Sequence, residues 1–187
     1  MSFVLVAKPS GAWSAVVVEN RYSDLTRGGY ATDTPAVATK IGTRGAKTAL
    51  SGGWTLIDKP DRTPADDDLM IHSAHASRYH WQIAGEVVNY LRGDWQIAHV
   101  YTLLNLPGRA LHYAQLCLRQ CEVNQIGDFD RAFAYEAVAR ALACQGDFSE
   151  AERYYRLAEA TGHAIAESED RELFFSDLSQ PPWYGLK

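Results

Sequence analysis

The sequence predicts an all-α fold for residues 63–187, built from antiparallel helical hairpins that stack as an α-α superhelix. The first observation behind this prediction is a hinge at Gly146, which separates two amphipathic segments. After the hinge, Ala151 and Ala158 lie two helical turns apart and therefore on one helical face. This arrangement is typical of two helices packed closely on either side of a short turn.

The second observation is an internal repeat. Superposing Ala110 on Ala151 gives an offset of 41 residues and aligns apolar or small residues along both hairpins. The aligned pairs are Ile97 with Val138, Ala98 with Ala139, Tyr101 with Leu142, Ala114 with Tyr155, and Cys117 with Ala158. A repeat of helical hairpins predicts a stacked array.

The hinge and the repeat resemble those of tetratricopeptide-like proteins with longer repeats, over about residues 63–187. The usual tetratricopeptide period is about 34 residues, and the surplus falls in residues 123–128, where a helix end and a loop can absorb it. Residues 58–68 and 72–81 are also similar to a group of small bacterial helical proteins to which no activity is assigned. The resemblance implies a fold and no catalytic residues.

Local signals divide residues 63–187 into six helices. The first start is the clearest, because Thr63 can cap the helix, Pro64 suits its first position, and Asp66 follows the cap by three residues. The expected helices cover about 63–84, 87–104, 109–124, 129–145, 149–161 and 164–178. The polar surface of the last one suits the capping helix that a stacked array requires.

Residues 1–62 are predicted to form a separate, poorly structured arm. Phe3–Ala7 and Trp13–Val18 are β-prone and could form a short hairpin, and residues 46–57 could form a short helix. Elsewhere, Gly and Thr clusters bury too little apolar surface to offset backbone ordering. The predicted organisation is therefore an irregular or β-hairpin arm at 1–62 and a helical domain at 63–187.

Charge and composition narrow the classes of partner. Residues 1–62 carry eight Lys and Arg against five Asp and Glu, whereas the remainder carries ten against eighteen, a net charge of −8. Phosphate binding needs clustered cations, so we expect no nucleic acid partner. No segment reaches the ~20 apolar residues of a membrane span, and no signal peptide is evident. Three cysteines fit a reduced protein, which predicts a cytoplasmic location.

One helix carries a possible metal site. Asp68, His72, His75 and Tyr79 follow one another at intervals of four, three and four residues, which places them on one helical face. A carboxylate with two imidazoles is a ligand set that Zn²⁺ or Fe²⁺ would accept. The alternative is structural: Asp68 complements the positive end of the helix, and the rings pack at a helix–helix contact.

A second possible site is a groove lined by the first helix of each hairpin. It would carry Trp95, His99, Tyr135, Glu136 and Arg140. The aromatic residues are equally explained by core packing, whereas charged side chains are costly to bury without partners. The sequence thus predicts a protein- or peptide-binding module with no cofactor and no catalytic residues. A metal- or small-molecule-binding protein, including an enzyme, is the alternative.

Overall fold

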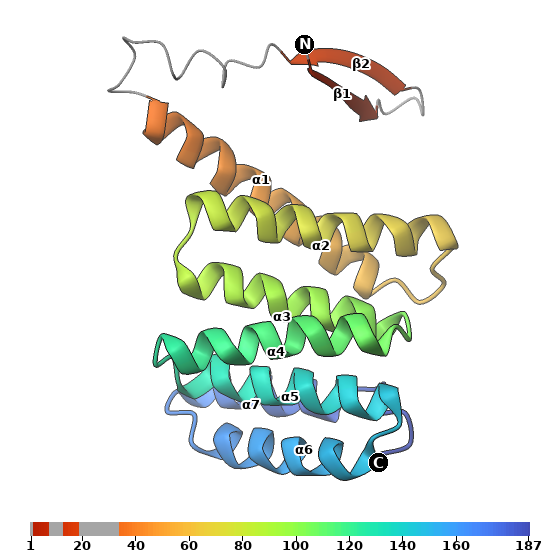
Figure 1. Cartoon of the computed structure of the whole chain (residues 1–187), viewed down its shortest axis with the longest axis vertical. Coiled ribbons are helices and arrows are strands. Elements are labelled where there is room, and N and C mark those ends of the chain that lie inside the picture. Colours follow the sequence, from red (N-terminus) through yellow and green to blue (C-terminus); the bar gives the residue numbers. More distant parts are fainter. Residues whose placement is uncertain (1, 8–12, 19–33) are drawn as a thin grey trace. The chain divides into compact units, whose positions relative to one another are not determined.

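A computed structural model describes residues 2–7, 13–18 and 34–187, with side chains from residue 43 onward. The chain divides into two compact units, Met1–Ala38 and Thr39–Lys187. The described elements are β1 (Ser2–Ala7), β2 (Trp13–Val18), α1 (Thr34–Ile57), α2 (Pro64–Ala84), α3 (Val87–Leu103), α4 (Pro107–Val123), α5 (Asp128–Gln145), α6 (Phe148–His163) and α7 (Ser168–Ser179). Figure 1 labels these elements along the chain.

In the first unit, β1 and β2 pair as antiparallel strands. Ser2 lies opposite Val18, and Ala7 lies opposite Trp13. Much of the predicted arm, including residues 19–33, lies outside the described residues. The arm also ends differently from its prediction, because α1 is twice as long as the expected helix at 46–57 and begins at Thr34.

The second half of α1 packs against other helices. Ala46 is fully buried, and a Cβ added to Gly53 would lie 3.2 Å from Nε2 of Gln96 on α3. Gly53 therefore permits a close helix–helix approach that offsets its low helix propensity. From Thr39 onward, α1 belongs to the same compact unit as α2–α7.

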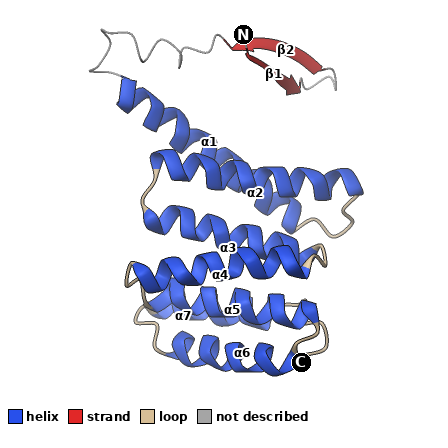
Figure 2. Cartoon of the chain, viewed as in Figure 1, coloured by secondary structure: helices blue, strands red, loops and turns tan. Residues whose placement is uncertain are grey.

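Six helices follow Thr63, and residues 63–187 contain no strand, as predicted. Loops of two to four residues join consecutive helices, so each helix runs antiparallel to its neighbour (Figure 2). The helix bounds agree with the predicted ones within about four residues. The largest difference is at α7, which begins at Ser168 because residues 164–167 form a loop. In that loop Ile165 is buried and its carbonyl accepts a hydrogen bond of 2.7 Å from Arg171.

The predicted helix ends are confirmed at both of the clearest positions. Thr63 and Asp66 form a capping box, in which the Thr63 backbone N–H donates to Oδ2 of Asp66 over 2.8 Å. Gly146 ends α5 with φ of 87°, a left-handed conformation that glycine adopts without a steric penalty.

The helices pack along the chain and also between alternate elements. Helix α3 contacts α2, α4 and α5, and α5 contacts α6 and α7. The repeat alignment is reflected in this packing, because Ala110 and Ala151 are both fully buried. Of the other aligned residues, all are buried except Tyr155, which is half-buried.

Candidate functional site

A buried ion pair on α5 is the centre of the predicted groove. Glu136 and Arg140 lie one helical turn apart, and Arg140 Nε donates to Oε1 of Glu136. Their side chains are only 1% exposed. Removing two charges from water is costly unless further partners compensate. The groups that surround this pair therefore determine whether it is a structural element or a binding site.

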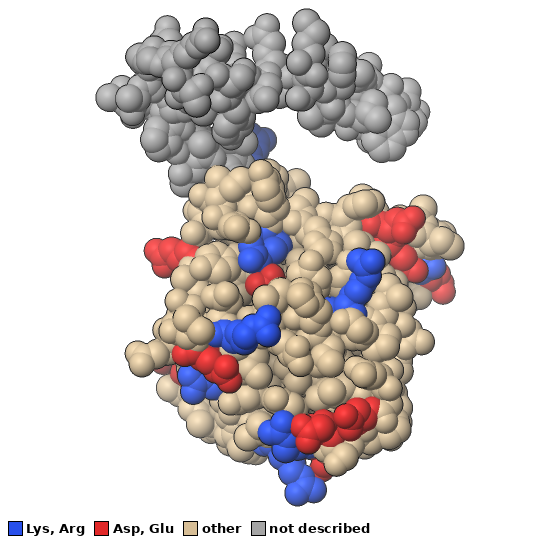
Figure 3. Space-filling model, in the orientation of Figure 1, with Lys and Arg blue, Asp and Glu red and all other residues tan. Residues whose placement is uncertain are grey.

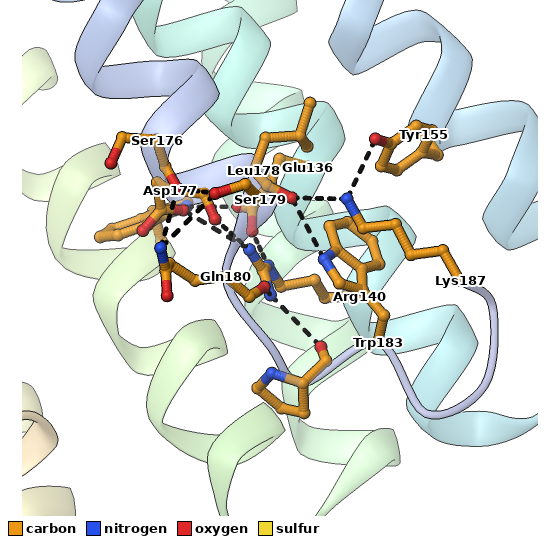
Figure 4. Close-up of polar contacts among 12 residues, drawn as sticks. Glu136, Arg140, Tyr155, Ser176, Asp177, Leu178, Ser179, Gln180, Trp183 and Lys187 are labelled. Carbon is orange, nitrogen blue, oxygen red and sulfur yellow. Dashed lines mark hydrogen bonds and ion pairs between the residues drawn. The ribbon is translucent and has the colours of Figure 1, made fainter.

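The chain itself provides those contacts for Arg140, through α7 and the C-terminal segment, residues 180–187 (Figure 4). Arg140 Nη2 donates to the carbonyl of Asp177 over 2.7 Å, and Nη1 donates to the carbonyls of Gln180 and Pro182 over 2.8 and 3.2 Å. The guanidinium also lies 4.3 Å from the ring centroid of Trp183. The C-terminal segment therefore occupies the position beside Arg140 where a partner was expected.

Further contacts hold the C-terminal segment in place. Trp183 Nε1 donates to the carbonyl of Leu178 over 3.2 Å. Lys187 Nζ donates to the same carbonyl over 2.8 Å and to the Tyr155 hydroxyl over 3.1 Å. Figure 4 shows Lys187 reaching both groups from the end of the segment. Trp183 is 5% exposed, so this segment is part of the core.

Trp95 connects the ion pair to a group of rings at α1 and α3. Its Nε1 donates to Oε2 of Glu136 over 3.1 Å. Its ring stacks on His99 with a centroid distance of 5.4 Å and an angle of 17°, and Trp54 of α1 lies 5.9 Å from Trp95. Four of the five predicted groove residues are thus brought together: Trp95, His99, Glu136 and Arg140.

Tyr135 is the exception among the predicted groove residues. Its ring lies 6.2 Å from that of Tyr154 on α6, and it packs against the hydrophobic core around α5 and α6. The physical reason is helical geometry, because consecutive residues of a helix lie about 100° apart around its axis. Glu136 therefore faces Trp95 while Tyr135 faces α6.

Two buried polar side chains beside these rings have unpaired atoms. Nδ1 of His99 and both Nε2 and Oε1 of Gln96 have no hydrogen-bond partner among the described residues. Burial, opposed by Glu136 and reinforced by Arg140, lowers the pKa of His99 to about 4, so the ring is neutral at pH 7. Buried polar atoms without partners carry a desolvation cost of about 1–3 kcal/mol each.

Asp177, on α7, lies beside the Glu136–Arg140 pair. Its Oδ2 is 3.7 Å from Nη2 of Arg140 and accepts no hydrogen bond from the described residues. Burial and the negative charge of Glu136 raise the pKa of Asp177 to about 6, while Arg140 opposes the shift. Neither Gln96 nor Asp177 was among the predicted site residues, since polar residues on helices carry no local signal of burial.

The predicted metal ligands all lie on α2 and differ in exposure. Asp68 and His72 are exposed, whereas His75 is half-buried. His75 Nε2 lies 3.0 Å from the Tyr101 hydroxyl, and burial lowers the pKa of His75. Within residues 43–187, whose side chains are described, no group of three or more His, Cys, Asp or Glu side chains is placed to hold a metal ion. A Zn²⁺ or Fe²⁺ site on this helix stays a prediction.

The same helix carries a surface that the sequence reading did not single out. Leu69, Tyr79 and Ile83 are 55%, 63% and 49% exposed, and His72 and Ala76 are exposed between them. These five residues, which we call the outer row of α2, follow one another at intervals of three and four. Three of the five are large apolar side chains, and large exposed apolar patches are a feature of interaction sites. The spacing was visible in the sequence, but exposure was not.

The exposed residues of α4 and α6 are mostly polar. They include Arg109, His112, Gln115, Arg119 and Glu122 on α4, and Arg153, Arg156 and Glu159 on α6. The exposed large apolar residues there, Val123 near the end of α4 and Phe148 and Leu157 on α6, do not form a row like that of α2. Figure 3 shows uncharged side chains over much of α2, with acidic side chains gathered near the start of that helix. The outer row of α2 therefore differs in chemistry from the faces of the next two even-numbered helices.

Comparison of the chain with protein-family models, with curated proteins and with solved structures found no match. Among the described helices, none is both long enough and apolar enough to cross a membrane.

Proposed function

We propose that this protein is a tetratricopeptide-like interaction module, in which the outer row of α2 binds a protein or a peptide. The observation that carries the proposal is the exposure of Leu69, Tyr79 and Ile83 on one helix. Leaving such side chains in water forgoes the stabilisation of about 25 cal/mol per Å² that their burial would give. A bound partner would recover this free energy.

The packing supports the tetratricopeptide-like assignment. Consecutive helices form antiparallel hairpins, alternate helices α3, α5 and α7 contact in succession, and the residues that align across the repeat are buried in both copies, Tyr155 aside. The proposal includes no catalytic activity, no cofactor and no nucleic acid partner. The three cysteines of the chain are free thiols, which a reducing compartment favours. We therefore place the module in the cytoplasm.

Site-specific photocrosslinking in cells tests this proposal. We expect p-benzoylphenylalanine in place of Tyr79 to give a discrete crosslinked protein adduct. The matched control is the same residue in place of Gln115, which is exposed on α4, and it should give none. Equal yields at the two positions, or no adduct at position 79, would rule out the outer row of α2 as the interaction surface.

A small-molecule-binding protein is the second candidate function. It is favoured by the unpaired buried atoms of Gln96 and His99 beside the rings of Trp54 and Trp95. A small polar molecule could satisfy those atoms and stack on the rings. Native mass spectrometry of the freshly purified chain should then detect a bound molecule that Gln96→Leu abolishes. A mass equal to that of the chain alone, in both proteins, would exclude this function.

A further inference from the structure

The outer row of α2 has the spacing of a helix that pairs with a second helix. Leu69, His72, Ala76, Tyr79 and Ile83 lie at intervals of three, four, three and four residues. This is the spacing of the seam in a two-helix coiled coil. The two ends of the row are equidistant from Ala76, which lies seven residues from both Leu69 and Ile83. The small side chain at the centre allows two helices to approach closely there.

Unpaired charges at the two ends of α2 fit an antiparallel arrangement. Asp68, near the start of the helix, is exposed and has no ion-pair partner among the described residues. The opposite end of α2 lies beside a basic part of α1, since a Cβ on Gly45 would lie 2.9 Å from Nε2 of His80. Arg44 and Lys47, on either side of Gly45, are exposed and have no ion-pair partner within residues 43–187.

We propose that a second copy of this chain covers the outer row of α2, with the two α2 helices antiparallel across a twofold axis at Ala76. This inference rests on the proposed function, because it names the partner of the same surface. The twofold axis places Leu69 of each copy against Ile83 of the other. It also brings the acidic start of one α2 toward Arg44 and Lys47 of the second copy. Antiparallel helices additionally align their dipoles favourably.

A second copy of this chain fits the outer row of α2 better than an unrelated helix does. An isologous interface needs one surface that is complementary to itself. The outer row supplies this through apolar ends equidistant from Ala76 and through flanking charges of opposite sign. One helix pair buries less area than a standard stable interface. We therefore expect a dimer that dissociates in the micromolar concentration range.

Sedimentation equilibrium of the full chain tests the association. We expect a monomer–dimer equilibrium, which Ala76→Glu shifts to monomer by weakening dimerisation at least tenfold. Val123→Glu is the matched control, because Val123 is 80% exposed on α4 and lies outside the row, and it should leave the equilibrium unchanged. Circular dichroism should show equal helicity in all three proteins. A chain that stays monomeric at high micromolar concentration overturns the proposal.

Cysteine crosslinking tests the orientation. In a Cys144→Ser background, which removes the half-buried native thiol, we would oxidise a mixture of Leu69→Cys and Ile83→Cys proteins. Antiparallel pairing predicts a disulfide between the two different variants and little between identical ones. Disulfides between identical Leu69→Cys chains would indicate parallel pairing and overturn the proposed geometry.

The two proposals can fail separately. If the chain is monomeric but p-benzoylphenylalanine at position 79 captures a different protein, the second copy is wrong and the interaction module stands. If position 79 captures nothing and the chain is monomeric, both are wrong. If the captured adduct has twice the mass of the chain and Ala76→Glu abolishes it, both are supported.

Discussion

The two ends of the helical unit differ in how far the chain itself binds buried polar groups and covers apolar side chains. At the closed end, which comprises α5, α6, α7 and the C-terminal segment, three backbone carbonyls and one carboxylate bind Arg140, while Oδ2 of Asp177 beside it accepts no hydrogen bond from the described residues. At the open end, residues 39–57 of α1 with α2 and α3 leave Gln96 and His99 partly unpaired and leave the outer row of α2 exposed. The closed end binds its buried charge with groups of the chain itself, whereas the open end leaves buried polar atoms unpaired and apolar side chains exposed.

This difference corrects the expectation for the groove. Charged groove residues were expected to contact a ligand because burial without partners is costly. The structure shows that Glu136 and Arg140 are buried and that the partners come from the chain itself. Glu136 and Arg140 thus mark a point of structural closure, and the outer row of α2 is the surface that we propose binds a partner.

The largest expected effect is at the closed end. Arg140→Met should destabilise the fold by about 3–5 kcal/mol, because it leaves Glu136 buried without its ion-pair partner. Arg153→Met is the control: Arg153 pairs with Glu150 on the surface of α6, where its side chain is 53% exposed, and its loss should change the unfolding midpoint little. Urea unfolding measures both. Equal effects would show that the closed end does not depend on Arg140.

A double variant sharpens that result. Arg140→Met leaves the negative charge of Glu136 buried without a partner, and Glu136→Gln removes that charge. The double variant should therefore lose less stability than the sum of the losses in the two single variants. An additive result would place the stabilisation in the carbonyl contacts of Arg140 rather than in its ion pair with Glu136.

The two ends should also respond oppositely to acid. The pKa of His99 is lowered from 6.5 to about 4, and that of Asp177 is raised from 3.8 to about 6. Between about pH 4 and pH 6, the unfolded chain binds a proton at His99, whereas the folded chain binds one at Asp177. The two effects on stability therefore nearly cancel in the natural chain.

Replacing either His99 or Asp177 should reveal the pH dependence of stability that the other residue contributes. Asp177→Asn should lose stability as the pH falls from about 6.5 to 4, because only the unfolded state gains a proton at His99. His99→Gln should instead gain stability as the pH falls from about 6 to 4, through Asp177. In each variant, the change in the free energy of unfolding over this pH range should differ from that of the natural chain by up to about 3 kcal/mol. Urea unfolding across this range provides the measurement, and parallel pH profiles for all three proteins would contradict both shifts.

The smallest expected effects on stability come from substituting two glycines, one at each end of the helical unit. A Cβ on Gly162, in α6, would lie 2.3 Å from the Phe174 ring, whereas a Cβ on Gly52, in α1, would have Ser73 Oγ at 4.0 Å as its nearest neighbour. Gly162→Ala should therefore destabilise the closed end by about 1–3 kcal/mol through overpacking. Gly52→Ala should stabilise the open end by about 0.5–1 kcal/mol through helix propensity. Thermal unfolding would measure both, and shifts of the same sign would contradict this packing difference.

The sequence by itself determined the helical segments. Thr63 with Asp66, and Gly146, fixed helix ends that the structure confirms, because capping depends on residues within one helical turn. The repeat alignment likewise identified Ala110 and Ala151 as buried, since helical periodicity states which residues share a face.

Tertiary structure alone decided which faces are covered, and by what. Trp95 and Glu136 meet across 41 residues, and Arg140 binds carbonyls 37 to 42 residues away. The exposure of the outer row of α2 has the same origin. Spacing along a helix shows that residues form one face, but burial of that face depends on segments distant in the chain, whose position no local pattern encodes.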